Sequence, residues 1–375
     1  MKNFIIQHIP KESYFSKPLY LDGHFLLAAP EMPFTEELRK TTLDWEFKEV
    51  FSDGDPREEY YSEEVDASPD QGGADTPLND DNQVKEAEAF YDSLYQYVEK
   101  LFTRMMIKNE LAFNDVAGKV KEICDAIKED RRFLLRVRKN IGPDQNYMIT
   151  HAINTTIISI IIGGYLKLPN HRLIELGVAA LLHEIGMLKL PSQIYLNNRS
   201  LTPQEKKAIL THPVLSFNML KSFNFPLTVS LAALEHHERE NGGGYPQKLL
   251  GDKISLYAKI IAVACSYEAL TSSRPHKDAK DGYTGMIDLL KNVGKQYDDT
   301  IVRALVYSLS IYPIGLYVLL SNGKKGQVID VNAENPRFPM VQIFGDLTPD
   351  GKNKILETSQ EGVLIVRPLR REEIS

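Results

Sequence analysis

Residues 236–246 read HHERENGGGYP, and this stretch is the most informative one in the chain about its fold. An adjacent histidine pair, His236 and His237, stands a few residues before three consecutive glycines. Neutral imidazoles suit iron, manganese, nickel and zinc, and a run of glycines is typical of a loop with dihedral angles that other residues avoid. The stretch therefore indicates metal-binding histidines on a helix, followed by a tight loop. A loop with a purely structural role is the alternative.

Three further histidines precede this stretch in segments of helical pattern, and an acidic residue follows one of them. They are His151, His183 with Glu184, and His212. One histidine on an apolar helix is usually structural, but five are harder to explain that way. Imidazole and carboxylate together form a ligand set for transition metals. We therefore predict a metal site, with scattered hydrogen-bonding histidines as the alternative.

Outward from these histidines, the sequence predicts a fold that is mainly α. Residues 141–312 are almost wholly helical in pattern, and apolar residues recur at spacings of three and four in 84–140 as well. Beyond Pro313, short apolar runs flank the turn signal at 322–323 and predict strands. We expect a helical metal-binding bundle with a small N-terminal α/β module and a small C-terminal β-rich tail.

Composition and periodicity divide the chain into five parts. The segment after the N-terminal module is acidic and rich in turn-formers, with Arg57 as its only basic residue. This favours a flexible linker over a regulated interaction segment. The predicted parts are a small α/β module (1–52), an acidic linker (53–83), a helical connector (84–140), a helical domain (141–312) and a β-rich tail packed on it (313–375).

The composition is that of an ordinary soluble protein, with 375 residues, 43% hydrophobic and 25% charged. The net charge of −7 argues against a nucleic-acid partner, so an anionic ligand would need a local metal or basic site. Two distant cysteines, Cys124 and Cys265, predict a reducing compartment. We find neither a signal-peptide pattern nor an uninterrupted membrane-length apolar run, so we expect a cytoplasmic protein without a membrane partner.

Several motifs together resemble the HD-GYP family of the HD phosphohydrolase superfamily, over roughly residues 145–345. Residues 181–186 (LLHEIG) are similar to its HD signature, with Glu in place of Asp, and 236–246 are similar to its GYP signature. The other stretches that match the family pattern are 201–205 (LTPQE), 211–213 (THP) and 260–275 (IIAVACSYEALTSSRP).

The resemblance implies an all-α core that holds two divalent metals, with iron or manganese favoured and zinc as a further candidate. Family members with three metals carry a Glu where this chain has Tyr147, so we expect two. The implied ligands are His151, His183, Glu184 and Cys265 for one metal, and Glu184, His212, His236 and His237 for the other, with Glu184 bridging.

The implied reaction is hydrolysis of cyclic di-GMP to linear pGpG or to GMP, with His183 and Glu184 at the catalytic centre. Two metals can clamp an anionic phosphodiester and lower the pKa of a bridging water. The implied ligand contacts are Gly243, Gly244, Tyr245, Arg274 and Lys277. A solvated charged surface is the alternative for the two cationic residues.

Three positions depart from the family pattern and leave the activity open. Glu184 and Cys265 replace aspartates, and Met187 replaces a lysine. Lys189 follows two residues later, but side chains two positions apart on a helix point in different directions, so Lys189 does not occupy the place of that lysine. A thiolate ligand favours zinc or iron, although Cys265 also suits a small buried helix position.

Three functions therefore follow from the sequence. They are a cyclic di-GMP phosphodiesterase, a catalytically degenerate cyclic di-GMP receptor, and a metal-dependent hydrolase of another phosphoester. The role of residues 1–52 stays unassigned. A homodimer or a signalling partner, engaged through this module or the connector, is a further expectation.

Overall fold

A computed structural model of the chain divides it into two compact units. The helical unit comprises Asn79–Gly285 and Asn292–Ser308, and the strand-rich unit comprises Met1–Leu78, Met286–Lys291 and Leu309–Ser375. The structure describes residues 2–17, 19–20, 26–28, 33–44, 47–57, 80–136, 146–195, 200–272, 282–309, 312, 314–330, 338–348, 353–359, 362–369 and 373–374.

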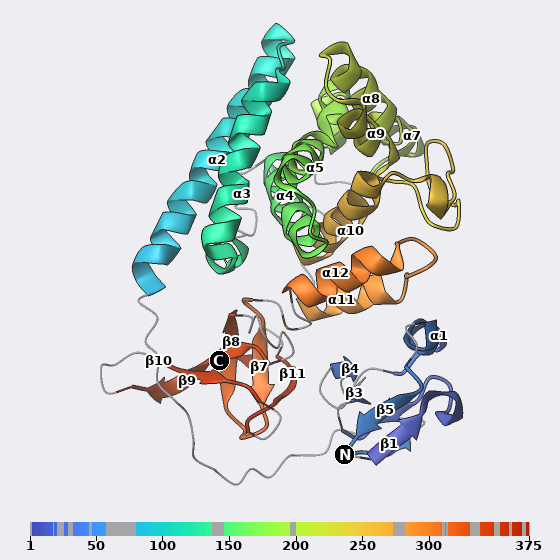
Figure 1. The fold of residues 1–375 in the computed structure, drawn as a ribbon, viewed down its shortest axis with the longest axis vertical. Helices are drawn as coiled ribbons and strands as arrows, with labels where there is room; N and C mark the ends of the chain where they lie inside the picture. Colours follow the sequence, from blue (N-terminus) through green and yellow to red (C-terminus); the bar gives the residue numbers. More distant parts are fainter. Residues whose placement is uncertain are drawn as a thin grey trace. The chain divides into compact units, whose positions relative to one another are not determined.

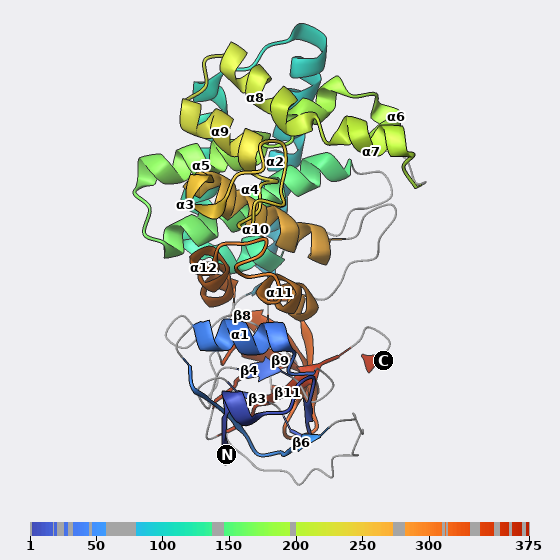
Figure 2. The ribbon, with the colours of Figure 1, turned by 90° about the vertical axis from the view of Figure 1, so that its right-hand side faces the viewer.

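Helices make up the helical unit, and α4, α5, α9 and α10 pack against one another within it (Figures 1 and 2). Its elements are α2 (Asp80–Lys108), α3 (Phe113–Arg136), α4 (Tyr147–Tyr165), α5 (Asn170–Leu182), the 3-10 helix η2 (Ile185–Lys189), α6 (Ser192–Tyr195), α7 (Pro203–Ile209), α8 (His212–Ser222), α9 (Leu227–Glu235), the 3-10 helix η3 (Gly251–Lys253), α10 (Leu256–Thr271) and α12 (Asp299–Leu309). Helix α11 (Gly282–Leu290) is shared between the two units. The predicted helical character of 141–312 is confirmed for the described residues.

Helix α4 forms the core of the helical unit. Every residue from Met148 to Gly163 is buried, and helices α2, α3, α5 and α10 contact α4. By length and composition α4 would suit a membrane span, since its mean hydropathy is 1.3. However, 89% of its most apolar 18-residue segment is buried inside the protein. A helix that is apolar all round either spans a membrane or fills a core. The burial of α4 by neighbouring helices is that of a core helix.

The helices of the predicted connector, α2 and α3, belong to the same unit as the histidines. They pack against each other and against α4, and α3 also packs against α5. Gly177 makes the contact between α3 and α5 close, because a Cβ there would lie 2.4 Å from Val120 Cγ1 and 3.1 Å from Ile160 Cδ1. The apolar stripe of α2 and α3 is therefore part of the core.

Two antiparallel sheets account for most of the strand-rich unit. The N-terminal module orders its strands β1 (Lys2–Ile5), β5 (Glu49–Ser52), β3 (Leu19–Tyr20) and β4 (Leu26–Ala28), and also contains the 3-10 helix η1 (Ile6–His8), α1 (Glu36–Asp44) and the pair β2 (Tyr14–Phe15) with β6 (Pro56–Arg57). The C-terminal sheet has the order β10 (Asn353–Glu357), β9 (Met340–Leu347), β8 (Lys325–Asp330), β7 (Tyr317–Leu320) and β11 (Ile365–Pro368). The predicted fold class, mainly α with an N-terminal α/β module and a C-terminal β-rich part, is confirmed.

Replacing Gly177 by Ala should destabilise the protein by about 1–3 kcal/mol, since the branched side chain of Val120 can yield only if α3 moves away from α5. The free energy of unfolding in urea measures the effect. Gly118→Ala is the matched control, because Gly118 is exposed on α3 and a Cβ there would meet nothing within 4 Å. The control should stabilise the protein by about 0.5–1 kcal/mol. A Gly177→Ala protein as stable as the wild type would contradict this account.

Candidate metal centre

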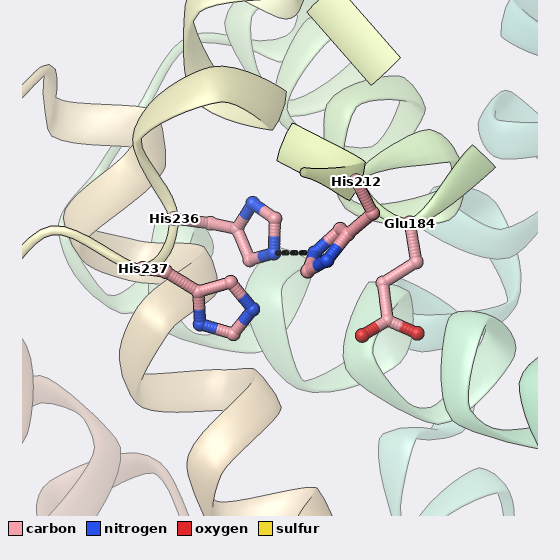
Figure 3. Close-up of side chains that lie close together, drawn as sticks. All are labelled: Glu184, His212, His236 and His237. Carbon is pink, nitrogen blue, oxygen red and sulfur yellow. Dashed lines mark hydrogen bonds between the residues drawn. The ribbon is translucent and has the colours of Figure 1, made fainter. Parts of the chain in front are cut away.

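Four potential ligand atoms converge where helix ends meet in the helical unit. His212 opens α8, His236 and His237 follow α9, and Glu184 follows His183 at the end of α5. One ligand atom from each of Glu184, His212, His236 and His237 lies within 4.8 Å of the others. Figure 3 shows the three imidazoles and the Glu184 carboxylate gathered around a common point.

Three of the histidines are held by the same type of hydrogen bond to a helix end. The last carbonyls of an α-helix lack an intrahelical partner, and each of these histidines donates from Nδ1 to the carbonyl oxygen three residues earlier. The bonds run from His183 to Ala180 at 2.6 Å, from His212 to Ile209 at 2.7 Å and from His236 to Ala233 at 2.9 Å. Because a carbonyl only accepts, each Nδ1 carries a proton, and in a neutral ring Nε2 presents a lone pair.

Two of these lone pairs face each other at close range. His212 Nε2 and His236 Nε2 are 3.2 Å apart, as the dashed line in Figure 3 shows. Burial lowers the pKa of both rings, and the neighbouring histidines lower the pKa of His236 further, so both rings are neutral at pH 7. Burial also lowers the pKa of His237, to about 3. Neither of two neutral rings with protonated Nδ1 can donate across this gap. A shared cation would satisfy both nitrogens, so the residues fit a metal.

A second group of ligand atoms comes from His151 on α4, His183 and Cys265 on α10, again within 4.8 Å of one another. The ring centroids of His183 and His236 are 4.9 Å apart, so the two groups are neighbours. Burial alone would raise the pKa of the Cys265 thiol, but His151 and His183 outweigh burial and hold the pKa at about 6. Cys265 is therefore a thiolate at neutral pH, which is the form that binds metals.

A buried carboxylate behind His151 was missed by the sequence analysis. Glu268 lies one turn after Cys265 on α10, is 1% exposed, and contacts His151 Nδ1 through Oε2. Burial opposes protonation of His151, but Glu268 and Cys265 outweigh burial and raise its pKa, so protons and a metal would compete for Nε2. The sequence held a signal for this residue, since Glu268 follows a candidate ligand by three positions in an apolar helix. Acidic residues are rarely buried unless they are paired, so an acid at this place predicts a partner in the site.

The region that contains both ligand groups is similar to known proteins. A family model described as "HD domain" matches residues 134–301. Cyclic di-GMP phosphodiesterase PdeB of Borreliella burgdorferi is 30% identical over 196 residues, which cover 52% of this chain and 52% of that protein. A cyclic di-GMP phosphodiesterase of Pseudomonas aeruginosa is 31% identical over 222 residues, 59% of this chain and 53% of that protein. The region of the helical unit that contains both ligand groups therefore matches an HD domain.

The chain spans about half the length of these two curated relatives. A solved structure described as a HDG"Y"P protein from Bdellovibrio bacteriovorus covers 81% of this chain and 97% of that chain. That superposition has a TM-score of 0.49 at 14% sequence identity.

In this domain, a buried carboxylate fixes the loop after His237. Glu238 is 3% exposed and accepts hydrogen bonds from the backbone N–H groups of Gln247, Lys248 and Leu249 at 2.6, 3.1 and 2.9 Å. The ring of Tyr245 stacks on His237, with centroids 4.6 Å apart and an interplanar angle of 20°. The loop therefore holds Tyr245 against a candidate metal ligand.

Two of the three glycines of this loop are required, each for a different reason. Gly242 has a φ of +72°, in the left-handed region that favours glycine. Gly244 is instead required by close packing, since a Cβ there would lie 2.4 Å from Glu238 Cα and 2.6 Å from the carbonyl oxygen of His237. Gly243 is exposed. The expectation of unusual dihedrals therefore applies to Gly242, while Gly244 brings the loop against the histidine pair.

Two departures from the HD-GYP pattern meet in one apolar cluster. Met187 is 3% exposed and packs with Met148 and Tyr195, and the partly buried Tyr147 packs against the same cluster. Lys189 is exposed. The positions where the family pattern has a lysine, and where three-metal members have a glutamate, thus contribute to hydrophobic packing here.

The structure gathers all seven predicted metal ligands into the two groups, with Glu184 in the group of His212, His236 and His237. Tyr245 lies beside them. Arg274 and Lys277 lie outside the described residues, and their contact with a ligand stays a prediction.

Glu238→Gln should loosen the loop, because an amide offers one accepting oxygen where the carboxylate uses both. We expect a loss of about 1–3 kcal/mol in stability and faster hydrogen exchange at the amides of Gln247, Lys248 and Leu249. Asp252→Asn, in the exposed turn that follows, is the control and should leave these exchange rates unchanged. Equal exchange in both variants would show that Glu238 does not hold the loop.

Proposed function

We propose that the HD-GYP domain hydrolyses cyclic di-GMP to linear pGpG or to GMP with two divalent metals bound. The observation that carries this proposal is the buried pair of imidazole nitrogens, His212 Nε2 and His236 Nε2, 3.2 Å apart. A second, thiolate-bearing ligand group lies next to them. The relatives named as cyclic di-GMP phosphodiesterases support the choice of substrate.

The two ligand groups support an assignment of residues to the two metals. One metal would be held by His151, His183 and Cys265, and the other by His212, His236 and His237, with Glu184 bridging them. Imidazole and carboxylate ligands suit iron or manganese, and the Cys265 thiolate suits zinc or iron. When bound, such metals supply Lewis-acid chemistry, since they neutralise charge on phosphoryl oxygens and lower the pKa of water.

Residues of the chain itself prepare this site. The bonds from Nδ1 to helix-end carbonyls fix the ring orientation of three histidines before any ligand binds. Burial and Glu184 raise the pKa of Tyr245, so its hydroxyl stays protonated and can donate to a phosphate oxygen. Arg274 and Lys277 would add cationic contacts to the phosphates. Each phosphodiester bond that opens consumes one water.

A catalytically degenerate receptor for the same nucleotide is the second candidate, and Met187 favours it. Met187 lies in an apolar cluster and offers no cation to a phosphate. Glu184 is one methylene longer than aspartate, and catalysis tolerates little displacement of a bridging carboxylate. Binding without turnover is the outcome that these two changes would produce. A hydrolase of another phosphoester is the remaining candidate.

We also propose that the protein is cytoplasmic. Cys124 and Cys265 are both free and buried, and a reducing compartment preserves free thiols. The N-terminal module or the helices α2 and α3 would then provide contacts to a signalling partner or to a second copy of the chain.

Turnover of cyclic di-GMP by the full chain, loaded anaerobically with iron or manganese, tests the proposed function. We expect product from the wild type and a loss of activity of at least about 100-fold in His183→Ala. Mutation of a residue that only hydrogen-bonds to a metal ligand typically lowers activity about 10–100-fold, and removal of a metal ligand itself should cost more. His171→Ala, at an exposed histidine on α5, is the matched control and should retain activity. Nucleotide binding without product at full metal loading would establish the receptor. Metal-dependent turnover of another phosphoester without cyclic di-GMP binding would contradict both.

Metal quantification after dialysis against a weak chelator tests the ligand sets. We expect two metals per chain in the wild type and fewer in Cys265→Ser and in Glu184→Ala. Cys124→Ser is the matched control: Cys124 is a buried thiol on α3 outside both ligand groups, and burial raises its pKa to about 11. Undiminished loading of Cys265→Ser would remove Cys265 from the ligand set, and unchanged content in Glu184→Ala would exclude a bridging role.

A further inference from the structure

A buried chain of hydrogen bonds connects helix α2 to His151. The Tyr91 hydroxyl is 3.0 Å from Asn154 Oδ1, Asn154 Nδ2 is 3.4 Å from Glu268 Oε1, and Glu268 Oε2 contacts His151 Nδ1. Exposure is 1% for Tyr91, 0% for Asn154, 1% for Glu268 and 2% for His151. The chain therefore runs through α2, α4 and α10 to a candidate metal ligand without contact with water.

The Glu268 carboxylate fixes the direction of every bond in this chain. A carboxylate only accepts, so the Asn154 atom that faces it is the amide nitrogen, and His151 Nδ1 carries a proton. The Asn154 carbonyl oxygen is then left to accept from Tyr91, whose hydroxyl donates. His151 Nε2 remains as the coordinating nitrogen, and it lies 3.4 Å from Cys265 Sγ.

We propose that Tyr91 is a positioning residue of the metal centre, although it lies outside the region 134–301 that the HD domain model matches. Tyr91 acts through Asn154 and Glu268 to hold the His151 ring with Nε2 toward Cys265 and His183. This inference rests on the metal site of the proposed function. The proposal gives helix α2 a role in the metal site itself, in addition to its place in the predicted connector.

Burial is the reason that one distant hydroxyl affects the ring. In the low dielectric of the interior, hydrogen bonds are strengthened and a lost donor is not replaced by bulk water. Without the Tyr91 hydroxyl, Asn154 Oδ1 loses this donor, and the Asn154 amide is freer to turn away from Glu268. The position of α2 on α4 then becomes a condition for the geometry at His151.

Zinc affinity of the metal-stripped full chain, measured by competition with a chromophoric chelator, tests this proposal. Tyr91→Phe should weaken the site that contains Cys265 by about fivefold, the value of one neutral hydrogen bond. Cobalt substitution identifies that site, because a thiolate ligand gives a charge-transfer band. At limiting cobalt this band should be weaker in Tyr91→Phe than in the wild type. Tyr97→Phe is the matched control on the same helix, since the buried Tyr97 hydroxyl has no hydrogen-bond partner among the described residues. Its affinity should equal that of the wild type.

A double-mutant cycle separates action through the chain from a general effect on packing. Glu268→Gln should weaken zinc binding by about 10–100-fold, and adding Tyr91→Phe should then cause little further loss, because residues in one network are not additive. Fully additive losses, or equal affinities for Tyr91→Phe and Tyr97→Phe, would overturn the proposal.

The outcomes also distinguish this proposal from the proposed function. If zinc affinity follows the expected pattern while cyclic di-GMP is neither bound nor hydrolysed, the proposed function fails and the role of Tyr91 stands. If cyclic di-GMP is hydrolysed while Tyr91→Phe keeps wild-type zinc affinity, the positioning role alone fails. A wild-type chain that binds no zinc, iron or manganese would overturn both.

Discussion

Neutral imidazoles whose lone pairs converge in a dry interior are the constraint on which the helical unit depends. His212 Nε2 and His236 Nε2 approach to 3.2 Å while burial keeps both rings uncharged. Each ring also donates a hydrogen bond from Nδ1 to a carbonyl oxygen at a helix end that has no partner within the helix. One side chain thus completes a helix terminus and presents a ligand atom, which is why helix ends rather than long loops build this site.

Close packing of the segment after Glu184 against α8 brings these helix ends together. A Cβ on Gly186 would lie 2.4 Å from the carbonyl oxygen of His212 and 2.5 Å from the nitrogen of Ser216. Ser216 Oγ accepts from the Gly186 N–H at 2.8 Å and donates to the carbonyl oxygen of His183 at 2.9 Å. The distance between Glu184 and His212 therefore depends on the absence of a side chain at Gly186.

Hydrophobic packing and polar positioning divide the surroundings of the centre between them. On one side, Met187 and Tyr147 contribute to an apolar cluster where the family pattern has polar residues. On the other side, Glu268 and Asn154 place buried polar groups behind His151. Hydrogen bonds thus orient His151, while Met187 supplies no positive charge for an anionic ligand. This combination keeps both a phosphodiesterase and a nucleotide receptor consistent with the site.

The sequence by itself determined the mainly α class and identified the candidate metal ligands, because apolar periodicity is local and only a few side chains bind metals. It did not indicate β10, whose five residues show little alternation. Only the tertiary structure decided that His183, His212 and His236 are held through Nδ1 and that the Glu268 carboxylate contacts His151. His151 and Glu268 are 117 residues apart, so their contact depends on how α4 packs against α10. A pattern read along the chain does not carry that information.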